Sequence, residues 1–392
     1  MSKAKKIRVI ISIVCISFIQ GLQYTVSPVL SQIQEHYPDV NISLVQMLIT
    51  APSLLAMIIA IISGWLVVKV SKKRLLLIGS FLAGLTGFLP LLSDSFGLLL
   101  FSRTLYGVGL GLATALNTAV VADFFEGGER TFIMGIQAAS VGAGMFIEMT
   151  LSGILGAYGF EKVYFVHIIG FISLFLLAIL LPDTGKTKIA NSEKIRLNAK
   201  VFKISFLGLL EFMFLITFTT NISMHVSGTI ADSSSASGAL TGVFSFSQII
   251  MGLALGWVIK VTKQYTLPAA MLNFAIGAVI LALFPGNYSL LLIGSVFCGF
   301  SQGMFIPQAM CEISNAVKPV ATAMASACFT CAMCIGQLIS PSVLNNAAKY
   351  ILEGATTANV YLISSIGMAV IAGIVIISKR LEKRRIKGRI LS

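Results

Sequence analysis

The feature that most constrains the fold is a series of long apolar runs separated by short polar breaks. A backbone in hydrocarbon must satisfy its own hydrogen bonds, and the polar–apolar alternation of a membrane barrel is absent, so each run is predicted to be a helix. About 20 apolar residues cross one bilayer, and twelve runs are close to that length. They cover 9–30, 43–67, 75–92, 98–121, 132–156, 163–182, 204–226, 237–259, 267–284, 289–311, 321–345 and 357–378.

Composition supports this interpretation. Of the 392 residues, 56% are hydrophobic and only 11% are charged, whereas soluble domains contain roughly a quarter charged residues. The spans and their short connections leave no stretch for a soluble catalytic domain. We therefore expect an all-α integral membrane protein with twelve transmembrane helices.

The basic residues predict the orientation, because Lys and Arg remain on the cytoplasmic side of a membrane. All but three of the 28 Lys and Arg residues fall on one side of the predicted topology, many of them in 183–203 and 379–392. The other side holds only Lys162 and Lys349, and the third residue lies within a span. We expect a multi-pass protein of the cell (inner) membrane with both termini in the cytoplasm. The net charge of +13 is then a topology signal rather than a sign of nucleic-acid binding.

An internal repeat divides the chain into halves. The only two tryptophans, Trp65 and Trp257, each follow a glycine, end a span and precede a basic turn, and they are 192 residues apart. The same offset relates two Gly-x-x-x-Gly pairs in spans four and ten, which are typical of close helix packing. These glycines are Gly107, Gly111, Gly299 and Gly303.

The repeat predicts four segments. Two six-helix halves, 1–182 and 204–378, would flank a cytoplasmic linker at 183–203, and a basic cytoplasmic tail would occupy 379–392. Parallel repeats of this kind place a substrate site near the membrane midplane, between the halves.

With these features, the whole chain resembles the major facilitator superfamily. The 64–74 stretch, from Gly64 to Arg74, is similar to the family's loop motif between spans two and three, with Val68 and Ser71 in place of an aspartate and a glycine. The 103–109 stretch resembles the fourth-span motif whose arginine is implicated in proton coupling. The Gly-Pro motif of span five, typical of antiporters, is absent. The resemblance implies a secondary transporter that works by alternating access, usually as a monomer, with Gly64 as a conformational or packing residue.

Three charged residues lie clearly within predicted spans, where charge is costly and marks function by default. Arg103 and Glu148 lie at similar depth on spans four and five, so we expect an ion pair or a shared proton site. Glu211 lies near the middle of span seven with no evident opposite charge. We assign all three to proton coupling or substrate binding; a salt bridge that only joins helices, or a hydrogen-bonded structural glutamate, is the alternative.

In the resembling family, spans one, four, seven and ten line the central cavity. Polar or aromatic side chains in these spans could orient a solute by hydrogen bonds or could join helices. The candidates are Gln20, Gln23, Tyr24, Tyr106, Asn117, Asn221, Gln302 and Gln308. Pro28 and Pro307 could break their helices and free carbonyls toward such a cavity, or could produce ordinary kinks.

Other kinds of chemistry find little support. No His, Cys and carboxylate cluster has metal-ligand spacing, and Cys328, Cys331 and Cys334 lie within a span without a fourth ligand. No nucleotide-binding motif or nucleophile–base pair stands out. We expect no metal, no cofactor and no enzymatic activity.

The leading hypothesis is a secondary transporter of a small organic solute, coupled to protons. Two buried acids suit a proton-antiporting exporter of cationic or neutral apolar compounds, whereas a membrane arginine suits proton-coupled uptake of a carboxylate. We lean slightly to export. A non-transporting membrane receptor or sensor is the alternative of another class.

Overall fold

The computed structural model describes residues 2–186, 197–227, 229–230, 233–317, 321–354 and 356–390. The secondary structure of these residues is helical, with no strand among them. The first part of the chain contains α1 (Lys3–Gly21), η1 (Leu22–Tyr24), η2 (Ser27–Val29), α2 (Leu30–His36), α3 (Ile42–Thr50), α4 (Pro52–Lys69), α5 (Lys72–Phe88), η3 (Leu89–Leu92), α6 (Phe96–Phe124), α7 (Gly127–Gly156), η4 (Phe160–His167) and α8 (Ile168–Leu180). The second part contains α9 (Ala199–Leu215), α10 (Thr217–Val226), α11 (Ser233–Thr262), η5 (Lys263–Tyr265), α12 (Thr266–Leu283), α13 (Tyr288–Ser314), α14 (Thr322–Ile351) and α15 (Thr357–Ile390).

Several helices begin at a side chain that caps their free N–H groups. Ser71 accepts a hydrogen bond from the backbone N–H of Arg74 at the start of α5, and Asn198 accepts one from Val201 at the start of α9. Asn287 does the same for α13. Such caps satisfy donors that have no partner inside the helix, so the polar breaks between apolar runs also set where the helices begin.

Among the described residues, eleven helical runs are long and apolar enough to cross a membrane. One of them, Ser233–Leu283, has 51 residues, more than twice the length that one crossing needs. It divides at η5, where Lys263 has a φ of 51°, a left-handed conformation that interrupts a helix. Counting α11 and α12 separately gives the twelve spans that the sequence predicts.

Some predicted boundaries differ from the structure. The predicted linker 183–203 is shorter, because α9 already begins at Ala199; its residues 187–196 lie outside the described residues. The predicted tail 379–392 continues the last helix as far as Ile390. Helical backbone therefore continues into polar stretches that the search for apolar spans assigns to connections.

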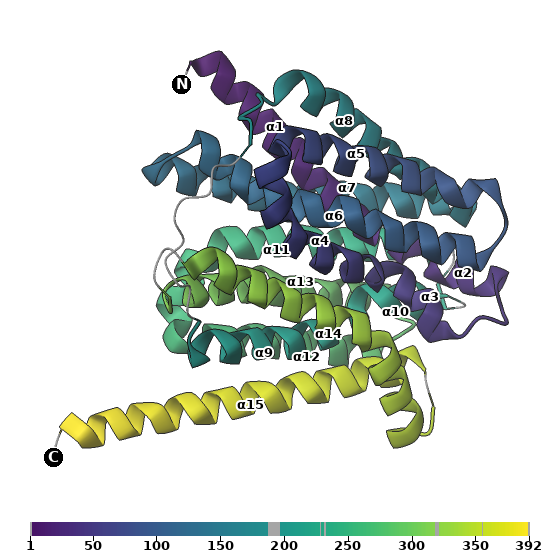
Figure 1. The fold of residues 1–392 in the computed structure, drawn as a ribbon. Helices are drawn as coiled ribbons and strands as arrows, with labels where there is room; N and C mark the ends of the chain where they lie inside the picture. Colours follow the sequence, from purple (N-terminus) through teal and green to yellow (C-terminus); the bar gives the residue numbers. More distant parts are fainter. Residues whose placement is uncertain are drawn as a thin grey trace.

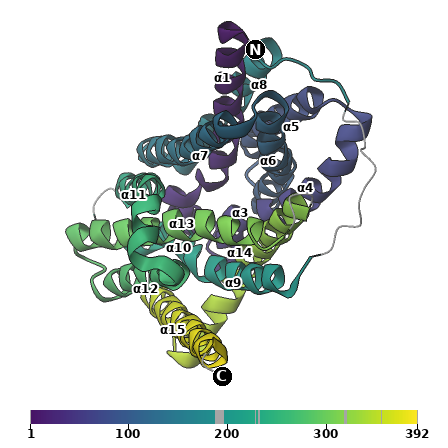
Figure 2. The same cartoon turned by 90° about the vertical axis from the view of Figure 1, so that its left-hand side faces the viewer.

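The helices form two groups, α1–α8 and α9–α15, and both termini lie at one end of the molecule (Figure 1). We call this the terminal end and the opposite one the far end. The groups meet where α7 packs on α11 and where α3 and α4 pack on α14; α7 and α11 also lie next to each other in Figure 2. At the first of these interfaces Gly153 faces Gly238, and a Cβ on either would overlap the other's backbone.

The predicted glycine pairs pack in the same way in both groups. A Cβ at Gly107 would overlap the carbonyl oxygen of Pro52, and one at Gly299 would overlap that of Phe244, 192 residues further on. Gly111 likewise lies against Ala56, and Gly303 against Gln248. The helix pairs α4–α6 and α11–α13 therefore repeat one packing arrangement at the offset found in the sequence. Gly64 has no such contact, because a Cβ there would meet nothing within 4 Å; its conformational role stays a prediction.

Candidate functional site: a central cavity between two groups of helices

A cavity of about 180 Å³ lies between the two groups of helices. None of its lining side chains is charged. Five are glutamines, three are methionines and two are aromatic. The lining residues are Gln20, Gln23, Tyr24, Ser53, Ala56, Met57, Ala60, Leu110, Thr114, Val141, Met145, Phe212, Gln248, Gln302, Ile306, Thr330, Met333, Cys334 and Gln337. This lining suits a ligand with a largely apolar body and a few hydrogen-bonding groups, and methionines adapt to ligands of different shape.

Three of the cavity amides have an atom without a hydrogen-bond partner. These atoms are Nε2 of Gln20 and Oε1 of Gln248 and of Gln302. A buried polar group without a partner is costly, so each of these amides gains from a donor or acceptor supplied inside the cavity. The three side chains line the cavity, while their unpaired atoms are themselves buried.

A polar network closes the cavity toward the far end. The side-chain amide of Gln23 donates to Ile49 O (3.1 Å), to Ser53 Oγ (3.1 Å) and to Gln337 Oε1 (3.3 Å). The hydroxyl of Ser53 donates to the same Gln337 oxygen at 2.8 Å. Gln337 belongs to α14 and its partners belong to the first group. The network therefore joins the two groups on the far-end side of the cavity.

The far end is closed by further hydrogen bonds between the groups. Ser31 Oγ lies 2.9 Å from Ser223 Oγ, and Ser27 Oγ donates to Thr219 O at 2.5 Å; both pairs are 192 residues apart. Asn345 Nδ2 donates to Gln46 Oε1 at 2.7 Å. In the described part of the chain, no hydrogen bond or ion pair joins the groups nearer the terminal end than the cavity.

Residues from α4, α6, α13 and α14 extend the cavity lining toward the terminal end. Ala60 lies beyond Ser53 on the way to Lys69, and Thr330 lies near the start of α14. Among the described residues, the two groups are therefore joined by hydrogen bonds at the cavity and at the far end, while the cavity lining continues toward the terminal end.

Spans one and seven are broken at equivalent positions. In span one, α1 ends at Gly21 and η1 follows; in span seven, α9 ends at Leu215 and α10 begins at Thr217. At the 192-residue offset, Tyr24 corresponds to Ile216, so the two breaks occur at equivalent positions of the repeat. Tyr24 thus lines the cavity from a segment whose carbonyls lack regular helical partners.

Arg103 donates hydrogen bonds to carbonyls of that segment, of which Leu22 O also accepts from Thr25. Its guanidinium is 1% exposed and donates to Leu22 O at 3.4 Å and to Gln23 O. Its Nε donates to Leu48 O at 3.0 Å. Leu48 O would normally accept from the residue four positions on, which is Pro52 and has no N–H. One side chain therefore supplies the donors that two interrupted helices lack.

His167 completes the surroundings of Arg103. Its Nδ1 lies 2.8 Å from Ala83 O and its Nε2 lies 3.2 Å from Arg103 Nη1. A carbonyl can only accept, so Nδ1 carries the proton and the Nε2 lone pair accepts from the guanidinium. The histidine is therefore neutral and buried, as a packed residue would be.

The predicted ion pair between Arg103 and Glu148 is not formed. The guanidinium is occupied by carbonyls and by His167, and neither Glu148 oxygen has a hydrogen-bond partner. The physical reason is that the break after Gly21 and the proline at position 52 leave backbone carbonyls close to the guanidinium. These carbonyls lie nearer to Arg103 than the carboxyl of Glu148 does. The coupling role given to Arg103 therefore stays a prediction without the expected partner.

Glu148 is fully buried on α7, one helical turn from the cavity-lining Met145. Its Oε2 lies so close to Gly21 that a Cβ there would overlap it. In the other half of the repeat, the position that corresponds to Glu148 is Ser340, whose hydroxyl donates to Met213 O at 2.6 Å. Met213 in turn corresponds to Gly21. A small hydroxyl thus fills the equivalent place in the second half without any buried charge.

Glu211 is also fully buried, next to the cavity-lining Phe212 on α9. Its Oε1 accepts from Ser301 Oγ at 3.3 Å, and its Oε2 has no partner. Neither Glu148 nor Glu211 lines the cavity itself. Each lies within one helical turn of a residue that does.

The remaining candidates divide into two sets. Gln20, Gln23, Tyr24 and Gln302 line the cavity. Tyr106 and Asn117 instead join α6 to α1, through Ile19 O and Ser17 Oγ respectively. Asn221 accepts from Gln46 at the far end, and Gln308 donates to Glu312. The first three join neighbouring helices, and Gln308 bonds within its own helix, α13. None of the four is in the cavity lining.

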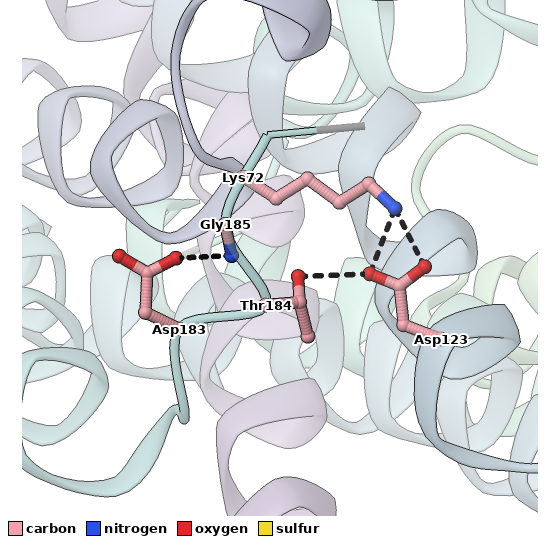
Figure 3. Close-up of polar contacts among 5 residues, drawn as sticks. All are labelled: Lys72, Asp123, Asp183, Thr184 and Gly185. Carbon is pink, nitrogen blue, oxygen red and sulfur yellow. Dashed lines mark hydrogen bonds and ion pairs between the residues drawn. The ribbon is translucent and has the colours of Figure 1, made fainter. Parts of the chain in front are cut away.

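The loop between α4 and α5 is held by an ion pair (Figure 3). Lys72 Nζ lies 2.6 Å from Asp123 Oδ1 at the end of α6, and Thr184 Oγ1 donates to Asp123 Oδ2 at 3.2 Å. Ser71 Oγ donates to Asp183 Oδ2 at 3.1 Å. These contacts tie the loop to α6 and to the segment after α8. The aspartate of the family's loop motif, which is Val68 in this chain, takes no part in them.

Comparisons with known proteins agree with this architecture. A family model described as Major Facilitator Superfamily matches residues 10–227 and 204–390. The quinolone resistance protein NorA of Staphylococcus aureus (strain COL) is 25% identical over 267 residues, which are 65% of this chain and 69% of that protein. The riboflavin transporter RibZ of Clostridioides difficile (strain 630) is 30% identical over 139 residues, which are 35% of this chain and 30% of RibZ.

Solved structures share the fold. The nucleoside transporter NupG (D323A mutant) superposes with a TM-score of 0.76 at 14% identity, over 94% of this chain and 99% of that one. A bacterial homologue of the human lysosomal transporter Spinster, in an inward-facing and occupied conformation, gives 0.71 at 16% identity, over 97% and 98%. The helical architecture, the two-group cavity and the match along nearly the whole sequence lead to one conclusion: this chain is a transporter of the Major Facilitator Superfamily and not an enzyme.

Proposed function

We propose that this protein acts as a monomer that exports neutral or cationic organic compounds with a largely apolar body, in exchange for protons. The observation that carries the proposal is the cavity, which is lined by five glutamines and no charged side chain, with one buried carboxyl within a helical turn of Met145 and another next to Phe212 in the sequence. The name of the NorA relatives, which refers to quinolone resistance, favours efflux.

The two carboxyls suit proton exchange because of where they lie. An ionised carboxylate without a cation partner is costly in an apolar interior, and Glu148 has no partner at all. When the cavity opens to water or receives a cation, that cost falls and the proton can leave. The arrangement therefore favours release of a proton as a cation enters.

Uptake of a carboxylate has less support. It would need a cation facing the cavity, and Arg103 is instead committed to carbonyls of broken helices. The charge distribution further suggests that the terminal end faces the cytoplasm. In that orientation the conformation described here would load substrate from the cell interior, between an N-terminal half (1–182) and a C-terminal half (204–378).

The test uses the purified chain in proteoliposomes, with ethidium as an aromatic cation that carries N–H donors. A pH gradient that is acidic inside should drive ethidium accumulation, because antiport does not depend on which way the protein is inserted. Accumulation driven only by an outside-acidic gradient would overturn antiport. Radiolabelled benzoate under an outside-acidic gradient tests the carboxylate alternative, with protein-free vesicles as the control because benzoic acid crosses lipid unaided. Protein-dependent accumulation of benzoate, without ethidium transport, would replace the proposal.

The carboxyl variants are matched to the structure. Glu148→Ser copies the residue at the equivalent position of the second half, and Glu211→Gln keeps the hydrogen-bonding shape. We expect each to abolish gradient-driven ethidium transport while ethidium still binds in detergent. Glu312→Gln, a charge removal outside the cavity, is the control and should transport normally. Full gradient-driven transport by both carboxyl variants would rule out these residues as the coupling groups.

A further inference from the structure

A second cavity, of about 240 Å³, lies at the far end, within the first group of helices. It is built by three connecting segments: the end of α2, the η3 segment with the loop after it, and η4. Its lining includes His36, Tyr37, Asp94, Phe160 and Tyr164. None of these residues lines the central cavity, so this is a separate site.

Asp94 supplies a fixed negative charge to this pocket. Its Oδ1 accepts from Tyr37 Oη at 2.6 Å and lies 2.8 Å from His36 Nε2. These hydrogen bonds lower the pKa of Asp94, with the bond from Tyr37 the larger cause. Glu161 is a second acidic residue of the lining. The pocket therefore favours cationic ligands.

Aromatic rings surround this charge. The His36 and Tyr37 rings meet edge to face with centroids 4.6 Å apart, and Phe160 lies 5.1 Å from His36. Tyr37 also packs on Phe96. Aromatic faces beside a carboxylate are the surroundings that alkylated ammonium groups prefer. A metal ion is a poor fit, because no group of three His, Cys, Asp or Glu in the described ranges could hold one.

One polar group in the pocket has no partner. Tyr164 is only 2% exposed, and its hydroxyl makes no hydrogen bond. Buried tyrosine hydroxyls usually find a partner, and this one belongs to a side chain that lines the cavity. The hydroxyl itself is buried behind the pocket surface, so a ligand hydroxyl would supply the missing bond after a small rotation of the side chain.

The surrounding surface has a matching charge. The described residues at the surface of the far end include more acids than bases, since Lys162 and Lys349 are the basic residues among them. The acidic residues are Glu35, Asp39, Asp94, Glu161 and Glu353. A surface of one sign raises the local concentration of ions of the opposite sign.

We propose that this far-end pocket binds a small organic ammonium ion that carries a hydroxyl group. The ammonium lies among the rings of Tyr37, Phe160 and His36 beside Asp94, and the hydroxyl bonds to Tyr164. Because the pocket is distinct from the central cavity, this binding does not depend on the transport reaction.

Choline is the probe, and titration calorimetry on the full-length protein in detergent at low ionic strength is the measurement. Its neutral isostere 3,3-dimethylbutan-1-ol should bind at least tenfold more weakly. Asp94→Asn should raise the choline Kd about threefold to fivefold, because the attraction between an ammonium ion and an exposed carboxylate is modest. Asp39→Asn removes the same charge from the same face outside the pocket, and should change the Kd less than twofold.

Tyr164→Phe provides an independent arm. Loss of one hydrogen bond should raise the choline Kd about threefold to tenfold and leave tetramethylammonium, which has no hydroxyl, unchanged. Equal binding of the neutral isostere, or equal weakening by Asp39→Asn and Asp94→Asn, would overturn the proposal. So would the loss of choline binding in Gln302→Ala, since that result would place choline in the central cavity.

Discussion

Replacing Arg103 tests whether this side chain holds broken helices together or transfers charge. The guanidinium satisfies carbonyls of Leu22, Gln23 and Leu48 and contacts His167. A buried acceptor left without a donor costs about 1–3 kcal/mol. Arg103→Leu removes the donors of Gln23 O and Leu48 O, whereas Leu22 O keeps its hydrogen bond from Thr25, so we expect a loss of about 2–4 kcal/mol in the free energy of unfolding.

Arg103→Lys separates the charge from the geometry. A lysine keeps the positive charge, but its single ammonium cannot reach three carbonyls in the plane of a guanidinium fork. We expect it to lose about half as much stability as Arg103→Leu. If Arg103 acted only through its charge, the lysine variant would instead match the wild type.

The assay is unfolding in mixed micelles by titration with dodecyl sulfate, followed by circular dichroism at 222 nm. Arg8→Leu is the matched control, because exposed Arg8 also donates to a backbone carbonyl, that of Ile179, at 2.7 Å. Water can replace that bond, so the change should stay within about 0.5 kcal/mol. Wild-type stability in Arg103→Leu, together with lost proton-driven transport, would refute the structural role argued here.

Two further predictions concern packing and the closed far end. Gly299→Ala should lower the melting temperature by several degrees, because its Cβ would overlap the carbonyl of Phe244, whereas Gly64→Ala should be neutral; equal effects in a thermal scan would contradict the packing argument. Ser31→Ala combined with Ser223→Ala removes the hydroxyl contacts of the far end and should populate states opened there. Spin-label distances between positions 39 and 353 in a cysteine-free background should then lengthen, and an unchanged distribution would show that these hydroxyls do not hold the far end closed.

Much of the architecture could be predicted because it depends on local patterns. The apolar runs predict the spans, and the recurrence of Trp65 at Trp257 predicts an offset that the structure repeats in the contacts of Gly107 and Gly299. Both patterns reflect constraints that act along one helix or between neighbouring helices. Both patterns can be recognised in a single sequence because positions exposed to lipid or in close backbone contact tolerate few residue types.

The partners of the buried charges could not be predicted in the same way. Arg103 and Glu148 lie at similar depth in the sequence pattern, yet the arginine bonds to carbonyls freed by Pro52 and by the break after Gly21. Such breaks are tertiary features, and no charge pattern records them. The cavity residues Gln248 and Gln337 were also missed. Both are amides in apolar spans, a usable signal, but in spans that the family resemblance does not assign to the cavity.

The two halves keep their packing and differ in their chemistry. Contacts at the 192-residue offset recur for the glycine pairs, and residues related by that offset meet at the far end, as Ser31 does with Ser223. The buried charges have no such counterparts: Glu148 corresponds to Ser340, and Arg103 corresponds to Ser295. At the position of Glu148, the second half is satisfied by the Ser340 hydroxyl, which donates to Met213 O, so the packing there does not require a carboxyl. Because a buried carboxyl without a partner is costly, its presence in one half favours a functional role for Glu148 that the packing alone does not explain.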